Sequence, residues 1–227
     1  MDKKIARDYR SGHRKRLREK FLERKCTDRE LIELLLTYAL PRVDVKPIVH
    51  DLLKRYGNIY RVITAPYEEL RKIAGLGENS AVFLKAIYDF MLLDYKYYLS
   101  EHPMFVCQKR LEDYCRLVLL DKKREEFHVL YLDFARRLMI DDTHAIGTMD
   151  SVGAYPREIL KRALELNARF VILLHNHPDG NTNFSEDDID LIDKIKEKLS
   201  VDEIEVIDHY LLAGDVLYSA KRLHWMK

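Results

Sequence analysis

One stretch in the last third of the chain constrains the fold most, because it fixes a strand, a turn and a helix in that order. Residues 170–174 form a short, uninterrupted apolar run, which is typical of a buried strand. Pro178 and the polar residues after it form a turn cluster that ends the strand. After Ser185, apolar residues recur at helical spacing and predict a helix over residues 186–199. A strand and a helix joined in this way are typical of a sheet covered by helices.

Three side chains of metal-binding type stand at the ends of these two elements. If the strand continues through His177, the side chains of His175 and His177 point to the same face, because side chains alternate along a strand. Asp188 falls in the first turn of the helix, where its carboxylate can swing back toward both imidazoles. Three protein ligands leave the fourth position of a zinc ion open for water, as catalytic sites do, whereas structural sites fill all four positions. The pattern predicts one Zn²⁺ ion per chain.

Each half of this pattern also has a structural explanation. Ser185 and Asp188 are what a helix capping box requires, with Ser185 as the N-cap. Two histidines at a strand end can be polar residues that meet solvent. Capping does not predict paired histidines upstream of Asp188, so the combination favours a metal site.

The stretch resembles the JAMM (JAB/MPN+) metallopeptidase signature, H-x-H-P, then ten residues between the second histidine and an aspartate, with S-x-x-D at the end. Nearly the whole chain resembles the bacterial RadC family. The matching segments include residues 147–148, 155–159, 163–168, 175–178 and 208–209. RadC-like chains usually carry serine and proline where this chain has Asp179 and Phe184, in a loop beside the site. The resemblance implies an MPN (JAB/JAMM) fold and a zinc-dependent hydrolase of peptide or isopeptide bonds, in a family whose name suggests DNA repair.

The resemblance also implies a general base and an oxyanion donor. The family's glutamate precedes the first core strand, which residues 124–133 match; Glu126, directly before Phe127, takes that position, with Glu125 as the alternative if the register shifts. Such a carboxylate takes a proton from the attacking water and returns it to the leaving group. By the same resemblance, Ser185 donates a hydrogen bond to the oxyanion of the tetrahedral intermediate. An N-cap role for Ser185 is the competing assignment.

The second half of the chain predicts a domain over residues 102–227. Strands are expected over residues 127–133, 137–147, 169–177, 203–213 and 216–219, and helices over residues 156–167 and 186–199. This alternation predicts an α/β domain, a mixed sheet flanked by helices. His209, at the end of a strand, is interpreted as a satisfied structural histidine, with a supporting role beside the metal as the alternative.

Residues 1–101 predict a separate small all-α domain. Helices are expected from Thr27 to Pro41, over residues 45–56, from residue 65 to Gly75 and from Gly77 through residue 88. The last two resemble a helix-hairpin-helix, in which backbone N–H groups at a helix N-terminus hold a DNA phosphate. Gly-x-Gly also serves as an ordinary helix stop, and Glu78 stands at the anion position.

The N-terminal segment is strongly basic, although the net charge of the whole chain is only +1. Residues 1–25 contain eleven Lys and Arg against four Asp and Glu. Such a cluster can bind nucleic-acid phosphates, or it can be the solvated face of a helix. DNA is therefore an expected partner, through this segment and the hairpin. The sequence does not decide whether residues 9–20 are a helix or an ordered arm.

Composition agrees with a cytoplasmic enzyme. No apolar run approaches the roughly 18 to 20 residues of a membrane helix, and the N-terminus lacks the apolar core of a signal peptide. Cys26, Cys107 and Cys115 are scattered and odd in number, which indicates reduced thiols. A homodimer is compatible with the sequence, which does not decide the oligomeric state.

Three functions fit these features. The preferred one is a zinc hydrolase of the JAMM metallopeptidase type. A metal-dependent nuclease or DNA-processing factor is the second, favoured by the basic N-terminus and the hairpin. The third is a non-catalytic DNA-binding scaffold, against which the complete ligand set and Glu126 argue, because a scaffold has no use for them. Resemblance of fold does not identify the substrate.

Overall fold

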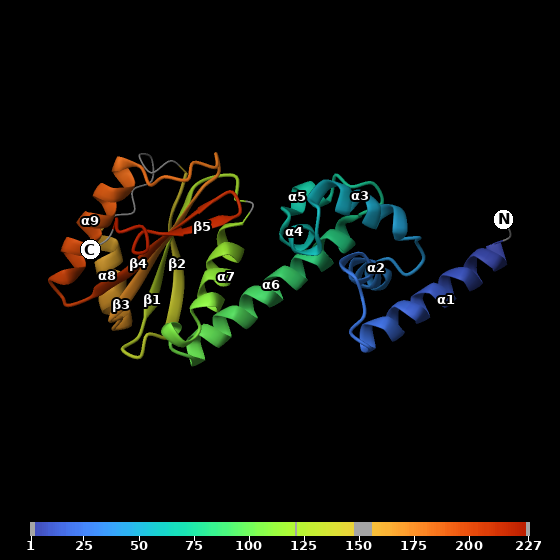
Figure 1. Cartoon of the computed structure of the whole chain (residues 1–227), viewed down its shortest axis with the longest axis horizontal. Helices are drawn as coiled ribbons and strands as arrows, with labels where there is room; N and C mark the ends of the chain where they lie inside the picture. The colour runs from blue at the N-terminus through green and yellow to red at the C-terminus, as the bar shows by residue number, and fades with distance from the viewer. Residues whose placement is uncertain (1–2, 121, 148–155, 226–227) are drawn as a thin grey trace. The chain divides into compact units, whose positions relative to one another are not determined.

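The computed structural model describes residues 3–120, 122–147 and 156–225, with residues 3–11 described by their backbone alone (Figure 1). The chain divides into two compact units, Met1–Phe90 and Met91–Lys227. This division falls inside helix α6 (Glu78–Glu101), whereas the boundary predicted after residue 101 coincides with the end of that helix. Among the described helices, none has both the length and the apolar character needed to cross a membrane.

The N-terminal unit is all-α, as predicted. Its helices are α1 (Lys3–Leu22), α2 (Asp28–Ala39), α3 (Lys46–Tyr56), α4 (Ile59–Thr64), α5 (Tyr67–Leu70) and the first part of α6. A capping box between Thr27 and Glu30 begins α2, and Asn58 caps α4. Apolar residues of these helices after α1 form one core, which includes Leu36, Leu52 and Leu84. The segment that the sequence left undecided is helical and forms part of α1.

The C-terminal unit is built on a mixed five-stranded sheet, as predicted. Its strands are β1 (Glu126–Leu132), β2 (Leu138–Ile146), β3 (Phe170–His177), β4 (Glu205–Ala213) and β5 (Val216–Ser219), in the spatial order β2-β1-β3-β4-β5. Only the β3–β4 pair among them is parallel; the other described pairs are antiparallel. Because β3 and β4 are parallel, their carboxyl ends lie side by side at the same end of the sheet.

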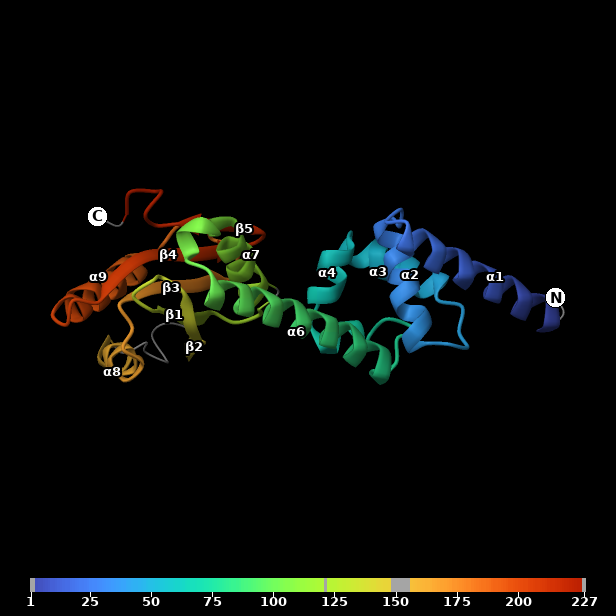
Figure 2. The same cartoon turned by 90° about the horizontal axis from the view of Figure 1, so that it is seen from below.

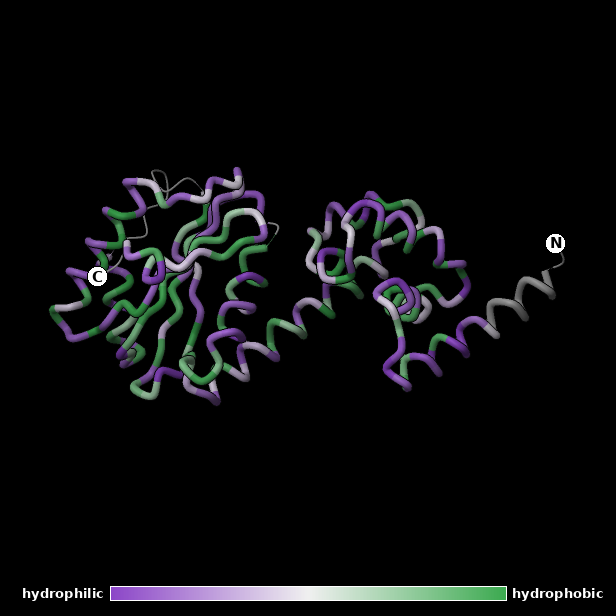
Figure 3. Tube along the Cα trace, in the orientation of Figure 1, coloured by the Kyte–Doolittle hydropathy of each residue, from purple (hydrophilic) through white to green (hydrophobic). Residues whose placement is uncertain are grey.

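Helices cover both faces of this sheet (Figures 1 and 2). On one face, α8 (Pro156–Leu166) and α9 (Glu186–Ser200) pack on the side chains of alternate strand residues. On the other face, α7 (Gln108–Leu119) and the end of α6 pack on the remaining strand residues. The central strands are therefore buried on both faces, and Figure 3 shows hydrophobic residues along them. The unit is a three-layer α/β/α domain.

Helix α7 was not predicted from the sequence. Its buried side chains nevertheless recur at helical spacing, at Leu111, Tyr114, Cys115 and Val118. The short helical turn η1 (Met104–Val106), which follows Pro103, precedes it. The pattern was present in the sequence, but it lies outside the short segments on which the resemblance to the family was based.

Candidate metal centre

Two imidazole nitrogens and the two oxygens of one carboxylate converge at the carboxyl end of β3. His175 and His177 face the α9 side of the sheet, and Asp188 reaches them from the first turn of α9. The Nε2 atoms of the two histidines lie 3.1 Å apart, and each lies 3.4 Å from an oxygen of Asp188. All three residues are buried. The structure thus brings together the three residues that the sequence singled out as ligands.

The separations of these atoms fit a small tetrahedral cation. With metal–ligand distances of about 2.0 to 2.1 Å, two ligand atoms of a tetrahedral zinc site lie about 3.4 Å apart. The 3.1 Å between the two imidazole nitrogens is close to that value, and each imidazole lies 3.4 Å from a different oxygen of the Asp188 carboxylate. Two imidazoles and a carboxylate are also a donor set that zinc accepts. A metal ion fits this group of residues.

The electrostatics of the trio formed by His175, His177 and Asp188 favour a cation. Burial alone would raise the pKa of Asp188, but the imidazoles of His175 and His177 and the Ser185 hydroxyl hold that pKa well below its usual range. Burial lowers the pKa of His175, in spite of Asp188. For His177, the effects of Asp188 and of the Asn181 carbonyl outweigh burial and raise the pKa. The low pKa keeps Asp188 ionised, and a buried carboxylate attracts a positive charge placed beside it.

Hydrogen bonds orient each of the three side chains. Nδ1 of His177 lies 2.9 Å from the carbonyl oxygen of Asn181, so it carries the proton and leaves the lone pair on Nε2. Nδ1 of His175 lies 2.7 Å from Nε2 of His209. The backbone N–H of Ser185 donates to Asp188 Oδ2 over 2.7 Å. The metal-facing atoms are thus held in place by a surrounding set of contacts.

Ser185 is the N-cap of α9, which was the competing assignment from the sequence. Its hydroxyl accepts from the backbone N–H of Asp188 at 3.1 Å and donates to Asp188 Oδ2 at 2.7 Å. The single hydroxyl proton is therefore directed at Asp188. An oxyanion role for Ser185 remains a prediction, and it requires the hydroxyl to turn away from this carboxylate.

Glu126, the expected general base, points away from the trio. Its carboxylate accepts from Lys122 Nζ at 2.9 Å and contacts His128 Nε2 at 3.2 Å, and His128 in turn contacts Asp141 at 2.9 Å. Asp141 also accepts from the Tyr114 hydroxyl of α7, so this network lies on the α7 face of the sheet. Side chains alternate along β1, and the same alternation carried back one residue before the strand puts the preceding side chain on the α9 side.

Glu125 is that preceding residue, and it lies near the trio. Phe127, two residues after Glu125, faces the same side of the sheet. It pairs with His175 across β1 and β3, and the centroids of the two rings are 6.4 Å apart. Residues 125–127 line a small cavity together with Ala145, Gly147 and His175. After burial and Asp188, the charge of Glu125 adds an upward effect on the pKa of both His175 and His177. Of the two glutamates that the sequence offered as the general base, the geometry therefore favours Glu125.

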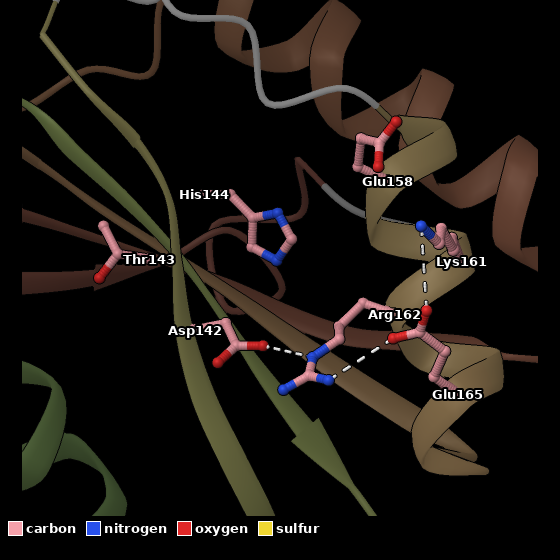
Figure 4. A pocket seen from close by; sticks show the side chains of 7 residues that line it. All are labelled: Asp142, Thr143, His144, Glu158, Lys161, Arg162 and Glu165. Atoms are coloured by element: carbon pink, nitrogen blue, oxygen red, sulfur yellow. Dashed lines mark hydrogen bonds and ion pairs between the residues drawn. The ribbon is translucent and has the colours of Figure 1, made fainter.

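A larger hollow, of about 300 Å³, lies between β2 and α8 (Figure 4). Arg162 pairs there with Asp142 at 2.7 Å and with Glu165 at 3.5 Å. The Tyr131 hydroxyl lies 2.8 Å from His144 Nε2. These groups satisfy one another, and no ligand-binding set converges among them. The trio is the better candidate for chemistry.

Comparisons with known proteins agree with this geometry. The family described as "RadC-like JAB domain" matches residues 105–225, just over half of the chain. The matched region contains His175, His177 and Asp188. A protein of Ruegeria pomeroyi named UPF0758 protein SPO0054 is 38% identical over 211 residues, which cover 92% of this chain and 94% of that protein. That name states no activity.

Proposed function

This chain belongs to the RadC family, and from that premise we propose that it is a zinc-dependent hydrolase of the JAMM metallopeptidase type. The observation that carries the proposal is the buried group formed by His175, His177 and Asp188, whose ligand atoms all lie within 4.8 Å of one another. The nitrogen-rich donor set favours zinc over magnesium or calcium, which prefer oxygen ligands. Peptide or isopeptide bonds are the proposed substrates.

His175, His177 and Asp188 would hold the zinc ion, which would supply a Lewis acid that polarises the scissile carbonyl and makes water acidic near neutral pH. Glu125 is the proposed general base, in place of Glu126. Its carboxylate takes a proton from the attacking water and returns it to the leaving amine. Its charge raises the pKa of both His175 and His177, whereas the Glu126 carboxylate is engaged with Lys122 and His128, and this supports the role of Glu125.

Backbone contacts hold the proposed base in position. The Asn176 side chain accepts from the N–H of Glu126 at 2.8 Å and donates to the carbonyl of Arg124 at 3.1 Å. The carbonyl of Glu125 itself accepts from the N–H of Gly147 at 2.9 Å. The residues on both sides of Glu125 are thus tied to β3, where the ladder between β1 and β3 ends at Phe127. A fixed base is ready for proton transfer without reorganisation.

Aromatic side chains keep the trio in apolar surroundings. The Phe184 ring lies 5.6 Å from that of His175 and 5.1 Å from that of Trp225. Phe184 itself is buried. Such surroundings exclude bulk water and strengthen the electrostatic interactions of the site.

The test is hydrolysis of a panel of fluorogenic peptides and isopeptide-linked peptides by the full chain. We expect cleavage that a chelator abolishes and added zinc restores, and no cleavage by His177→Ala. Oligonucleotides in the same panel test the alternative of a nuclease. Cleavage of DNA without cleavage of any amide would contradict the proposal.

DNA binding by the N-terminal unit stays a prediction, and the described contacts give it little support. Arg14 donates to backbone carbonyls, among them that of Leu40, and Lys20 pairs with Glu30. Lys85, the first lysine of α6, donates to carbonyls at the end of α4. Gly75 has φ of 82°, and a Cβ there would lie 3.1 Å from Ile48. The glycine turn is therefore explained by local packing.

A further inference from the structure

A third buried imidazole lies beside the two of the trio. His209 belongs to β4, the parallel neighbour of β3, and its relative exposure is 0%. Its Nε2 lies 2.7 Å from Nδ1 of His175. The rings of Phe127 and Phe184 lie edge-on to it at 5.8 and 5.1 Å. In the described part of the chain, its Nδ1 has no hydrogen-bond partner.

This arrangement is unfavourable for a residue that only fills space. A buried polar atom without a partner destabilises the folded state. Phenylalanine would pack among the same aromatic rings without that cost. The sequence interpretation of His209 as a satisfied structural histidine is therefore incomplete, because one of its two nitrogens is unsatisfied. What the imidazole adds is the hydrogen bond to His175.

A count of protons gives this bond a direction. Both rings are neutral, since each is buried among aromatic side chains and a charge there is costly. A cation can bind Nε2 of His175 only if that atom has a free lone pair, so the ring proton must sit on Nδ1. Nδ1–H of His175 then donates to Nε2 of His209, whose own proton sits on the unpartnered Nδ1.

The opposite direction removes one of the three ligands. If His209 carries its proton on Nε2 and donates, His175 must accept through Nδ1. The proton of His175 then sits on Nε2, the atom that faces His177 and Asp188. In that tautomer the trio offers one ligand fewer.

We infer that His209 is a positioning residue of the metal site, which accepts the Nδ1 proton of His175 and so selects the tautomer that presents Nε2 to the cation. This inference rests on the proposed metal site. It assigns to β4 a part in the site that the three ligands alone do not reveal. Histidine ligands of metals generally need such an acceptor, and its loss typically lowers metal affinity by about 10 to 100-fold.

The test compares the zinc affinity of the full chain with that of three variants, by competition with a chromophoric chelator. His209→Phe keeps an aromatic ring but removes the acceptor, and we expect zinc to bind about 10 to 100-fold more weakly. His209→Gln offers an amide oxygen in place of Nε2 and should recover part of the loss. His144→Phe, a change of the same kind at the histidine beside Tyr131, is the matched control and should bind zinc as the wild type does.

A second measurement needs no variant. Nitrogen-15 NMR of the imidazoles in the zinc-loaded wild type should find both His175 and His209 protonated on Nδ1. A proton on Nε2 of His209 would overturn the inference, as would zinc affinity in His209→Phe equal to that of the wild type. Failure of the wild type to bind zinc at all would instead overturn the proposed function, and this inference with it.

Discussion

Replacement of Asn176 by alanine should separate the stability of the site from its metal binding. The Asn176 side chain is buried and bridges the N–H of Glu126 and the carbonyl of Arg124, at 2.8 and 3.1 Å. Asn176→Ala breaks both hydrogen bonds, each of which contributes about 1 kcal/mol, so the free energy of unfolding should fall by about 2 kcal/mol. The melting temperature should fall by roughly 4 to 8 °C for a chain of this size.

The assay is urea unfolding followed by fluorescence of Trp225, the single tryptophan of the chain, which lies in the C-terminal unit against Phe184. Asn183→Ala, at an exposed asparagine of the same unit, is the control and should unfold like the wild type. Zinc affinity of Asn176→Ala should be unchanged, because its side chain faces away from the ligands. Hydrolysis should fall by up to about 100-fold, since Glu125 loses its fixed position. Unfolding at the wild-type urea concentration would refute this reasoning, and so would a parallel loss of zinc.

Three other predictions concern the base, the buried network and the glycine turn. Glu125→Gln should retain zinc, and its rate of hydrolysis should fall by about 10² to 10⁴-fold. Glu126→Gln should keep most of the wild-type activity. A kinetic assay in which Glu126→Gln loses more activity than Glu125→Gln would return the role of base to Glu126. Burial lowers the pKa of His128, but the carboxylates of Asp141 and Glu126 outweigh it and raise that pKa above the unfolded value of about 6.5. The stability that His128 contributes is therefore complete below about pH 6.5 and is lost as the pH rises through the folded-state pKa. The difference in free energy of unfolding between wild type and His128→Gln should shrink from pH 6 to pH 9, and a constant difference would contradict this. Gly75→Ala should destabilise the N-terminal unit by roughly 1 to 2 kcal/mol, because residue 75 has a positive φ and the added Cβ would contact Ile48. Gly77→Ala is the control, because a Cβ there meets nothing within 4 Å. Equal melting temperatures of the two variants would contradict this strain.

The sequence predicted the elements of the site because they obey strong local rules. The apolar run that ends at His175 can only be a buried strand or a short helix, and the turn at Pro178 decides its end. The Ser185 cap fixes where α9 begins, and therefore where Asp188 lies. Period-two alternation then brings both histidines to one face. These predictions needed no knowledge of how the strands pair.

What the sequence left open depends on pairing between distant segments. Glu125 and Glu126 are chemically alike, and only the pairing of Phe127 with His175 decides which of them faces the trio. His209 becomes a neighbour of His175 through the parallel pairing of β3 with β4, which local spacing does not encode. Helix α7 had a readable pattern but matched no motif. The network around His128 likewise depends on α7, through Tyr114.

The zinc content of the purified protein tests the central claim most directly. The full chain, purified without chelators, is analysed by inductively coupled plasma mass spectrometry beside the His175→Ala/His177→Ala double variant. We predict close to one zinc ion per wild-type chain and almost none in a double variant that remains folded. Absence of zinc from the wild type, even after incubation with zinc salts, would contradict a metal-dependent hydrolase.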